Sequence, residues 1–302
     1  MMFMKKLKIG YIGLGKMGVN MCLLLKERGH EIIAWNRGEE GRRRGREAGI
    51  KTVNSLKELA GNLPGRRIIW LMVSHNGVDE IIKELLPLLN RQDIVIDGGN
   101  CFFEDTIKRA KLLKKHGIMF LDAGVSGGPA GARSGACIIV GGDKVAYKKV
   151  LPIIKTAAAP GAYGYFGSHG AGHFVKMVHN GIEYGMMQAL AEGFAVLKKS
   201  QFKLNLKQIA GLYNNRSVIE SRLVGWLAGA YKKFDEDLKK VSGSVTHTGE
   251  GEWTVKTARK LSVPVKVIED AFKFRVASAK NPSYNGKILS ALRNQFGGHS
   301  AR

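Results

Sequence analysis

Short apolar runs alternate with amphipathic segments along the first 120 residues of this chain. Apolar runs bounded by glycine or polar residues are typical of buried strands, and apolar positions repeated every three or four residues are typical of helices. The pattern predicts strands over 7–12, 31–35, 67–73, 93–97 and 118–122, and helices over 19–28, 78–89 and 103–116. Because strands that alternate with helices form parallel βαβ units, we expect a doubly wound α/β sheet.

The second half of the chain has a different pattern. Alanines and glycines are frequent over 157–172, and from His173 onward the apolar spacing is predominantly helical. The pattern predicts helices over 171–199, 206–213, 218–231 and 265–278. We therefore expect two domains, an α/β domain over 1–170 and an all-α domain over 171–302, with a ligand cleft between them.

Composition agrees with a globular protein and adds a strong positive charge. The 302 residues are 44% hydrophobic, and 48 Lys and Arg against 25 Asp and Glu give a net charge of +23. Such a field attracts anions of any kind. Apart from Arg42–Arg44 and Arg46, the basic residues are dispersed and follow no nucleic-acid-binding motif. A basic cytoplasmic proteome or an anionic small substrate explains the charge as well as nucleic acid does, and a specific nucleic-acid partner is not expected.

Cysteine usage and hydropathy bear on location. Cys22, Cys101 and Cys137 are isolated and lack metal-ligand spacing, so neither a disulfide framework nor a metal site is expected. No segment has the length of a membrane span or the apolar core of a signal peptide. A reducing cytoplasm fits these features, with no membrane partner.

A glycine-rich turn follows the first predicted strand and opens the first predicted helix. In this context the pattern G-x-G-x-x-G indicates a dinucleotide site, because the glycines let a pyrophosphate approach the helix N-terminus. The residues of this turn are Gly13, Leu14, Gly15, Lys16, Met17 and Gly18.

The end of the second strand bears on the choice of cofactor. Asn36, Arg37 and Gly38 stand where an NAD-selective site usually carries an acid for the ribose hydroxyls. Arg37 can instead pair with a 2′-phosphate, which favours NADP without excluding NAD. The alternative is that Arg37 is a solvated turn residue.

Further loops fall at the carboxyl ends of predicted strands, where ligands bind in such sheets. The loops with Val73, Ser74, His75 and Asn100 are expected to edge the nicotinamide, and His75 on its own is expected to be a loop side chain rather than a catalyst. A glycine-rich turn over 122–132 contains Ser126, Gly127 and Gly128, whose amides and hydroxyl can bind a carboxylate or hydroxyls. A purely structural role for this turn is the alternative.

One helical segment carries a possible base and a possible acid. Lys176 and Glu183 are seven residues apart, almost two helical turns, so their side chains leave one face roughly 10 Å apart, with Asn180 between them. Two such groups can move protons at two atoms of one small molecule. A solvated surface pair is the alternative.

Anion ligands also occur near the end of the chain. Thr248–Trp253 is expected to be a glycine-flexed loop, and residues near a C-terminus often fray. If they are ordered, Arg275, Arg293 and His299 can hold a phosphate through charge-assisted hydrogen bonds.

Together these motifs resemble the decarboxylating 6-phosphogluconate dehydrogenases, a family within the β-hydroxyacid dehydrogenases. The likeness extends over nearly the whole chain, is most specific over Gly172–Tyr184, and is supported by 13–18, 96–100, 125–128 and 293–299. It implies a Rossmann-type dinucleotide-binding domain followed by a helical domain for substrate binding and dimerisation. The loop before Trp253 is similar to the short-chain branch, which lacks the duplicated helical domain.

The resemblance also implies individual roles. Lys176 would be the general base and Glu183 the general acid. The substrate ligands would be Asn100, Ser126, Gly127, Gly128, His179, Asn180 and Tyr184, with Arg275, Arg293 and His299 at the phosphate end. The last two would come from a partner subunit of a homo-oligomer, a dimer or tetramer.

The implied reaction oxidises 6-phosphogluconate at C3, with reduction of NADP or NAD, and releases CO2 to give ribulose 5-phosphate. It needs no metal, and it belongs to the pentose phosphate pathway or gluconate utilisation. A 3-hydroxyisobutyrate or tartronate semialdehyde dehydrogenase would share the dinucleotide turn and Lys176, yet would need neither Glu183 nor the phosphate ligands. A non-enzymatic nucleotide- or nucleic-acid-binding protein would dispense with both acid and base.

Overall fold

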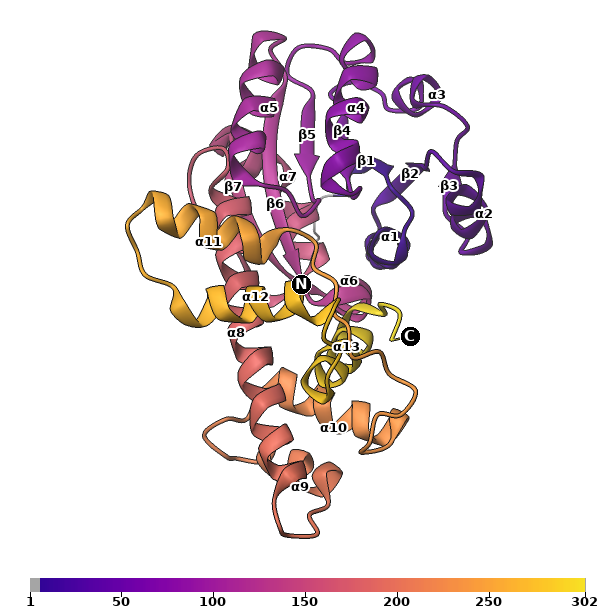
Figure 1. Ribbon diagram of the computed structural model, residues 1–302. Helices are drawn as coiled ribbons and strands as arrows, with labels where there is room; N and C mark the ends of the chain where they lie inside the picture. Colours follow the sequence, from indigo (N-terminus) through magenta and orange to yellow (C-terminus); the bar gives the residue numbers. More distant parts are fainter. Residues whose placement is uncertain (1–5, 302) are drawn as a thin grey trace. The chain divides into compact units, whose positions relative to one another are not determined.

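The computed structural model describes residues 6–301 and contains two compact units. The first unit extends to Met177 and the second begins at Val178. The first contains one mixed β-sheet with its helices, and the second contains helices (Figure 1). Helix α8 (Ala171–Lys199) begins in the first unit and continues into the second.

The first unit is built on an eight-stranded sheet. Its order, β3-β2-β1-β4-β5-β6-β7-β8, contains the dinucleotide-fold order 3-2-1-4-5-6, with the change of direction between β1 and β4. Neighbouring strands are parallel except for the antiparallel pair β6 and β7. The strands are β1 (Lys8–Ile12), β2 (Glu31–Trp35), β3 (Lys51–Thr52), β4 (Ile68–Leu71), β5 (Ile94–Asp97), β6 (Met119–Ser126), β7 (Ala136–Gly142) and β8 (Ala158–Tyr165).

Two hydrophobic cores lie against this sheet, as a doubly wound arrangement requires. Along β4, Ile68 and Trp70 belong to one core, whereas Ile69 and Leu71 belong to the other. Successive strand residues point to opposite faces, so an all-apolar strand is buried on both. The helices of this unit are α1 (Lys16–Glu27), α2 (Glu39–Glu47), α3 (Leu56–Gly61), α4 (His75–Leu85) with the 3-10 turn Leu86–Leu88, α5 (Phe103–Lys115), α6 (Gly128–Ser134) and α7 (Lys144–Ala157).

Helices of the second unit surround a core that includes Met187, Phe194, Leu227 and Leu289. Several begin at a residue whose side chain accepts a hydrogen bond from a backbone N–H of the first turn, as Ser221 does for α10. After α8 they are α9 (Leu206–Tyr213), α10 (Arg222–Phe234), α11 (Glu250–Lys260), α12 (Lys266–Ser278) and α13 (Tyr284–Gly297). Among the residues that the structure describes, no helix is long and apolar enough to cross a membrane.

Most strands and helices expected in the first 120 residues are present, and the expected helices over 171–199 and 206–213 have the same bounds in the structure. Other segments differ from the expectation. The predicted turn over 122–132 contains the end of β6 and the start of α6, and the loop expected over Thr248–Trp253 becomes α11 at Glu250. Strand β8 lies in the alanine- and glycine-rich region because it pairs with β7, a long-range contact that leaves no periodicity in the sequence.

Candidate active site

The glycine turn lies between β1 and α1, as its sequence predicts. Gly13 has a φ of +104°, a conformation that favours glycine, and a side chain at Gly18 would collide with the Gly13 carbonyl. A Cβ at Gly15 would meet no atom within 4 Å. The turn therefore leaves open space beside the N-terminus of α1, where Lys16 and Met17 begin the helix, and it fits the pyrophosphate of a dinucleotide.

The end of β2 is tied to this turn by Asn36. Its Oδ1 accepts a hydrogen bond from the N–H of Leu14 at 2.9 Å, and its Nδ2 donates to the carbonyl of Gly38 at 2.9 Å. Arg37 forms ion pairs with Glu80 and Glu84 of α4, at 2.6 and 3.2 Å. The Arg37 guanidinium thus faces oxygen anions in this structure, next to the segment expected to meet the ribose.

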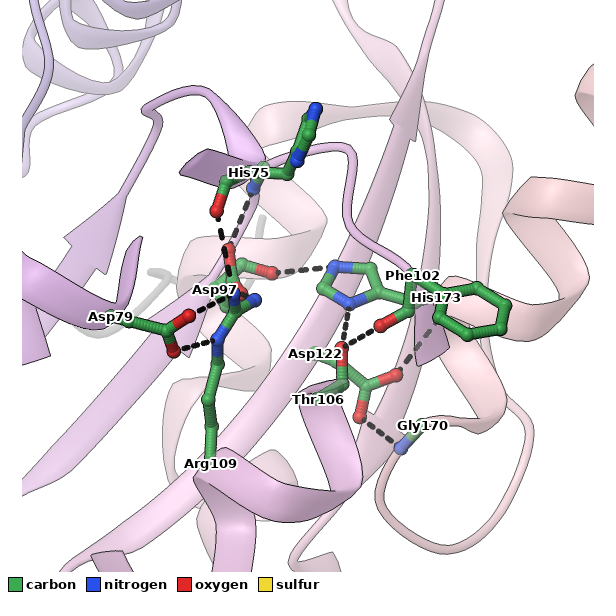
Figure 2. A network of polar contacts seen from close by, with 10 residues as sticks. His75, Asp79, Asp97, Phe102, Thr106, Arg109, Asp122, Gly170 and His173 are labelled. Carbon is green, nitrogen blue, oxygen red and sulfur yellow. Dashed lines mark hydrogen bonds and ion pairs between the residues drawn. The ribbon is translucent and has the colours of Figure 1, made fainter. Parts of the chain in front are cut away.

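The segments after β4 and β5 are joined by a network of polar contacts around the buried Arg109 (Figure 2). Arg109 of α5 binds both carboxylate oxygens of Asp79, at 2.6 and 3.0 Å, and donates to the carbonyl of His75 at 3.3 Å. The Oδ1 of Asp97 accepts from the N–H of Gly99 at 3.0 Å, which shapes the loop that carries Asn100. Val73, Ser74, His75 and Asn100 therefore lie at the carboxyl ends of the adjacent strands β4 and β5, as expected.

Ser126, Gly127 and Gly128 form the junction between β6 and α6. Gly127 and Gly128 have φ values of +134° and +63°, so the chain reverses here through conformations that L-residues rarely adopt. Ser126 is the last residue of β6 and pairs with Cys137 of β7.

Lys176 is buried, with 7% of its surface exposed, in the part of α8 that belongs to the first unit. Its side-chain stem lies on Gly124 of β6, where a Cβ would come within 2.8 Å of the lysine Cγ. Gly172 packs equally closely, since a Cβ there would stand 2.6 Å from the carbonyl oxygens of Asp122 and Ile139. The two glycines let the first turn of α8 lie directly on the sheet. A solvated lysine, the alternative reading of this residue, does not agree with this burial.

Glu183 and its neighbours occupy the part of α8 in the second unit. The Nδ1 of His179 lies 3.0 Å from the Oδ1 of Asn180 and 4.0 Å from Glu183 Oε2. Tyr184 is buried, and its ring carries the Arg275 guanidinium 3.4 Å from the ring centroid. Burial raises the pKa of the Tyr184 hydroxyl.

Two buried arginines form the most strongly charged part of this unit. Arg275 is 3% exposed, and Arg293 is buried and donates from Nη1 to Thr246 Oγ1 at 2.8 Å. Burial lowers the pKa of both guanidinium groups, and the charge of Arg293 lowers that of Arg275 further. Two buried like charges stabilise an anion that they can share, so the pair is suited to a phosphate.

His299 and Glu250 complete the description of this region. His299 follows α13, and its carbonyl accepts from Asn294 Nδ2 at 2.7 Å. Sequence reasoning missed Glu250, which is 4% exposed, accepts hydrogen bonds from Thr248 Oγ1, and raises the pKa of both arginines. It also missed Gly124, although a glycine inside a strand often marks a close approach of another element.

Fold and site together define a nicotinamide-dinucleotide oxidoreductase made of a Rossmann-type unit followed by a helical unit. Residues 8–169 match the family model described as the NAD binding domain of 6-phosphogluconate dehydrogenase. Residues 172–300 match the C-terminal domain of 6-phosphogluconate dehydrogenase. The chain belongs to the 6-phosphogluconate dehydrogenase family.

Individual relatives agree with this family. An NAD(+)-dependent, decarboxylating 6-phosphogluconate dehydrogenase of Haloferax volcanii is 36% identical over 295 residues, which cover 97% of this chain and 98% of that protein. The Plasmodium falciparum 6-phosphogluconate dehydrogenase, solved in its apo form and in complexes with NADP+ and with 6-phosphogluconate, superposes with a TM-score of 0.80. It is 30% identical, with 96% of this chain and 70% of that chain covered.

A 3-hydroxyisobutyrate dehydrogenase of Mycobacterium tuberculosis has the same fold. Its TM-score is 0.76 at 19% identity, with 96% of this chain and all of that chain covered. At this identity the likeness concerns the fold alone, so it does not favour that substrate.

Proposed function

We propose that this chain catalyses the oxidative decarboxylation of 6-phosphogluconate to ribulose 5-phosphate and CO2. The observation that carries the proposal is the buried pair Arg275 and Arg293, beside Tyr184 and therefore next to Glu183 along α8. A phosphate carries more charge and more acceptor oxygens than the single carboxylate of a non-phosphorylated β-hydroxyacid, so it can bind two guanidinium ions at once.

The dinucleotide would be held by the glycine turn over 13–18, by the segment 36–38 and by the loops after β4 and β5. When bound, its nicotinamide accepts the hydride from C3 of the substrate. Lys176, as the neutral amine, takes the proton of the C3 hydroxyl. Lys176 is buried, and desolvation is the general reason why a lysine amine can serve as a base near neutral pH.

Decarboxylation then uses the same two residues in new roles. As the bond to the carboxylate breaks, protonated Lys176 stabilises the enolate oxygen on C3. Glu183 gives its proton to the carbon that becomes C1 of ribulose 5-phosphate. The spacing of nearly two helical turns along α8 supports this division, since the two protons move at different carbons.

Steady-state assays test this proposal directly. Purified protein should reduce a nicotinamide cofactor with 6-phosphogluconate and release one CO2 for each cofactor reduced. Turnover of 3-hydroxyisobutyrate without turnover of 6-phosphogluconate would overturn the assignment.

The phosphate end is tested by Arg293→Lys. This change keeps the charge and loses the planar donor pair, so we expect KM for 6-phosphogluconate to rise about tenfold with kcat nearly unchanged. Arg222→Lys, on an arginine that stacks on Trp226 of the same unit, is the matched control and should leave KM unchanged. An unaltered KM in Arg293→Lys would remove Arg293 from the phosphate site.

We infer that NADP is favoured over NAD. The inference is supported by the end of β2, where the chain continues with Asn36, Arg37 and Gly38 in place of the acid that usually binds the ribose hydroxyls. In Arg37→Gln, kcat/KM for NADP should fall roughly 10- to 100-fold, as for a lost charge-assisted bond, and that for NAD should change little. Equal losses for both cofactors would contradict a 2′-phosphate contact.

We further infer a homo-oligomer in which the C-terminal tail reaches the site of a partner subunit. Exposed apolar residues of the second unit, such as Ile182 and Met186 of α8 and Val267 of α12, support an association surface. Light scattering would measure the oligomer. Mixing inactive Lys176→Met and His299→Ala proteins should restore activity if His299 acts on a partner's site, and a monomer in solution would refute this arrangement.

A cytoplasmic location is part of the same proposal. Cys22, Cys101 and Cys137 are all free, and Cys137 is exposed, which suits a reducing compartment. Fractionation of the cells that express the protein would test it.

A further inference from the structure

The first turn of α8 is attached to the sheet by a buried histidine that the proposed reaction does not use. His173 is 1% exposed and lies one helical turn before Lys176. Its Nε2 lies 3.1 Å from the carbonyl oxygen of Asp97, at the end of β5, and its Nδ1 lies 2.7 Å from Thr106 Oγ1 of α5 (Figure 2). The ring therefore connects α8 to β5 and α5, whose residues stand 76 and 67 positions earlier in the sequence.

The partners determine which nitrogen carries the proton. A carbonyl oxygen only accepts, so Nε2 must be the N–H that donates to Asp97. Nδ1 then accepts from Thr106 Oγ1, whose single hydroxyl proton also faces the Phe102 carbonyl at the longer distance of 3.2 Å. Both nitrogens of the ring are thus engaged, and the distance of 2.7 Å is ordinary for such a bond.

A second attachment comes from β6. The buried carboxylate of Asp122 accepts from the N–H groups of Gly170 and His173, both at 2.9 Å, just before and within the first turn of α8. A carboxylate at a helix N-terminus also complements the helix dipole. With Gly172 packed on the strands, the backbone before Lys176 is held from the side of β5 and from the side of β6.

The same network reaches the cofactor side of the sheet through Asp97. Its backbone carbonyl binds His173, its Oδ1 shapes the turn before Asn100, and its Oδ2 lies 3.6 Å from Arg109 Nη1. Arg109 in turn holds the carbonyl of His75. One buried set of contacts therefore links the loops after β4 and β5 to the turn that presents Lys176.

A metal site is the other reading of this cluster. Asp97, Cys101 and His173 offer ligand atoms within 4.8 Å of one another, and all three are buried. Both nitrogens of His173 are engaged in hydrogen bonds, however, and the positive charge beside Asp97 is already supplied by Arg109. Burial also raises the pKa of the Cys101 thiol, which disfavours the thiolate that a metal requires. These contacts therefore describe a hydrogen-bonded attachment of the first turn of α8 to the sheet.

We propose that His173 is a positioning residue for Lys176, and that it acts through its hydrogen bond to the Asp97 carbonyl. The bond fixes the first turn of α8 relative to β5 and so sets the lysine amine against the carbon that loses its hydride. The proposal rests on the proposed function, since it concerns the base of that reaction. A displacement of a catalytic group by about 1 Å can cost on the order of 100-fold in rate.

Two substitutions separate the two bonds of the ring. In His173→Gln the side-chain amide reaches the position of Nε2 and can still donate to Asp97, whereas in His173→Asn the shorter amide reaches only the position of Nδ1 and Thr106. We expect kcat to fall about 10- to 100-fold in His173→Asn and only a few-fold in His173→Gln. The KM for the dinucleotide should stay within about threefold of the parent value in both, because the glycine turn is untouched.

His30→Asn is the matched control. His30 is also a buried histidine of the first unit, 4% exposed, with its ring bonded to the N–H of Leu7 and to Thr156 Oγ1. The Tm of His30→Asn should fall to a similar extent as that of His173→Asn, whereas kcat per folded enzyme should stay at the parent value. With 6-phosphogluconate deuterated at C3, the isotope effect on kcat should increase in His173→Asn and not in His30→Asn, since a misplaced base slows the step that breaks the C3–H bond.

Equal kcat values for His173→Asn and the parent, or equal losses in His173→Asn and His173→Gln, would overturn the proposal. Wild-type protein that does not turn over 6-phosphogluconate would refute the proposed function instead. Hydrogen exchange tests the attachment of α8 independently of activity. The backbone amides over 172–177 should exchange faster in His173→Asn than in His173→Gln and His30→Asn. Unchanged exchange in that segment of His173→Asn would also overturn the proposal.

Discussion

The chemistry of two basic side chains in this protein depends on the residues that bury them. The aliphatic stem of Lys176 packs against Gly124, and the guanidinium of Arg275 lies over the ring of Tyr184. Both are cations removed from water, a state that is unfavourable unless an anionic partner or a neutral form relieves it. In the proposed reaction the lysine is the base, whereas the arginine, which stays charged, binds the phosphate.

The role of Glu183 is tested by Glu183→Gln. An amide cannot deliver the proton to the enediol, so we expect kcat for CO2 release to fall about 100-fold or more, with dinucleotide affinity unchanged. Glu192→Gln, on the same helix and bonded to Gln188, is the control and should keep full activity. Unimpaired turnover in Glu183→Gln would exclude this residue as the acid.

At the scale of elements, helix α8 is the decisive one. Its 29 residues begin on β6 and β7 of the first unit, where Gly172 allows backbone contact, and end at Lys199 in the second unit, whose core includes Met187 and Phe194. One helix therefore carries the proposed base and the proposed acid, seven residues apart. Rigid elements hold reacting groups more accurately than loops do.

The contact between α8 and β6 leads to a prediction for Gly124→Ala. The added methyl group would press on the stem of Lys176, so kcat should fall about 10- to 100-fold while dinucleotide binding is retained. In Gly193→Ala, also on α8, the methyl meets no atom within 4 Å, and the helix should be stabilised by about 0.5–1 kcal/mol. Steady-state kinetics and thermal unfolding of the two variants measure the difference. Full activity in Gly124→Ala would show that the lysine tolerates displacement.

At the scale of the whole molecule, the net charge of +23 is the dominant property. Many surface cations are paired with acids, as Arg44 is with Glu40 and Arg133 with Glu27, yet the excess of 23 positive charges remains. A field of this sign raises the local concentration of anionic substrates and cofactors.

This field predicts a salt-dependent reaction. Because ions screen exposed charges beyond about 10 Å at 0.1 M, kcat/KM for 6-phosphogluconate should fall several-fold between low salt and about 0.5 M salt. The change should lie in KM, and sucrose at the same osmolarity should leave it unaffected. Salt-independent kcat/KM would mean that the buried arginines alone account for substrate capture.

Local patterns in the sequence determined a good part of this molecule. The buried strands β1, β2 and β5, the glycine turn and the bounds of α8 follow from apolar spacing and backbone geometry over a few residues. The candidate acid and base were also readable, because a seven-residue spacing on a helix is a local property.

Tertiary structure alone decided the environment of those residues. The bond from His173 to Asp97 spans 76 positions, Arg275 and Met187 meet across 88, and β8 is a strand because β7 pairs with it. Which distant side chains meet depends on how the chain returns on itself, and no local periodicity encodes it. The burial of Lys176 and of the two arginines, on which their proposed roles depend, is the result of those long-range contacts.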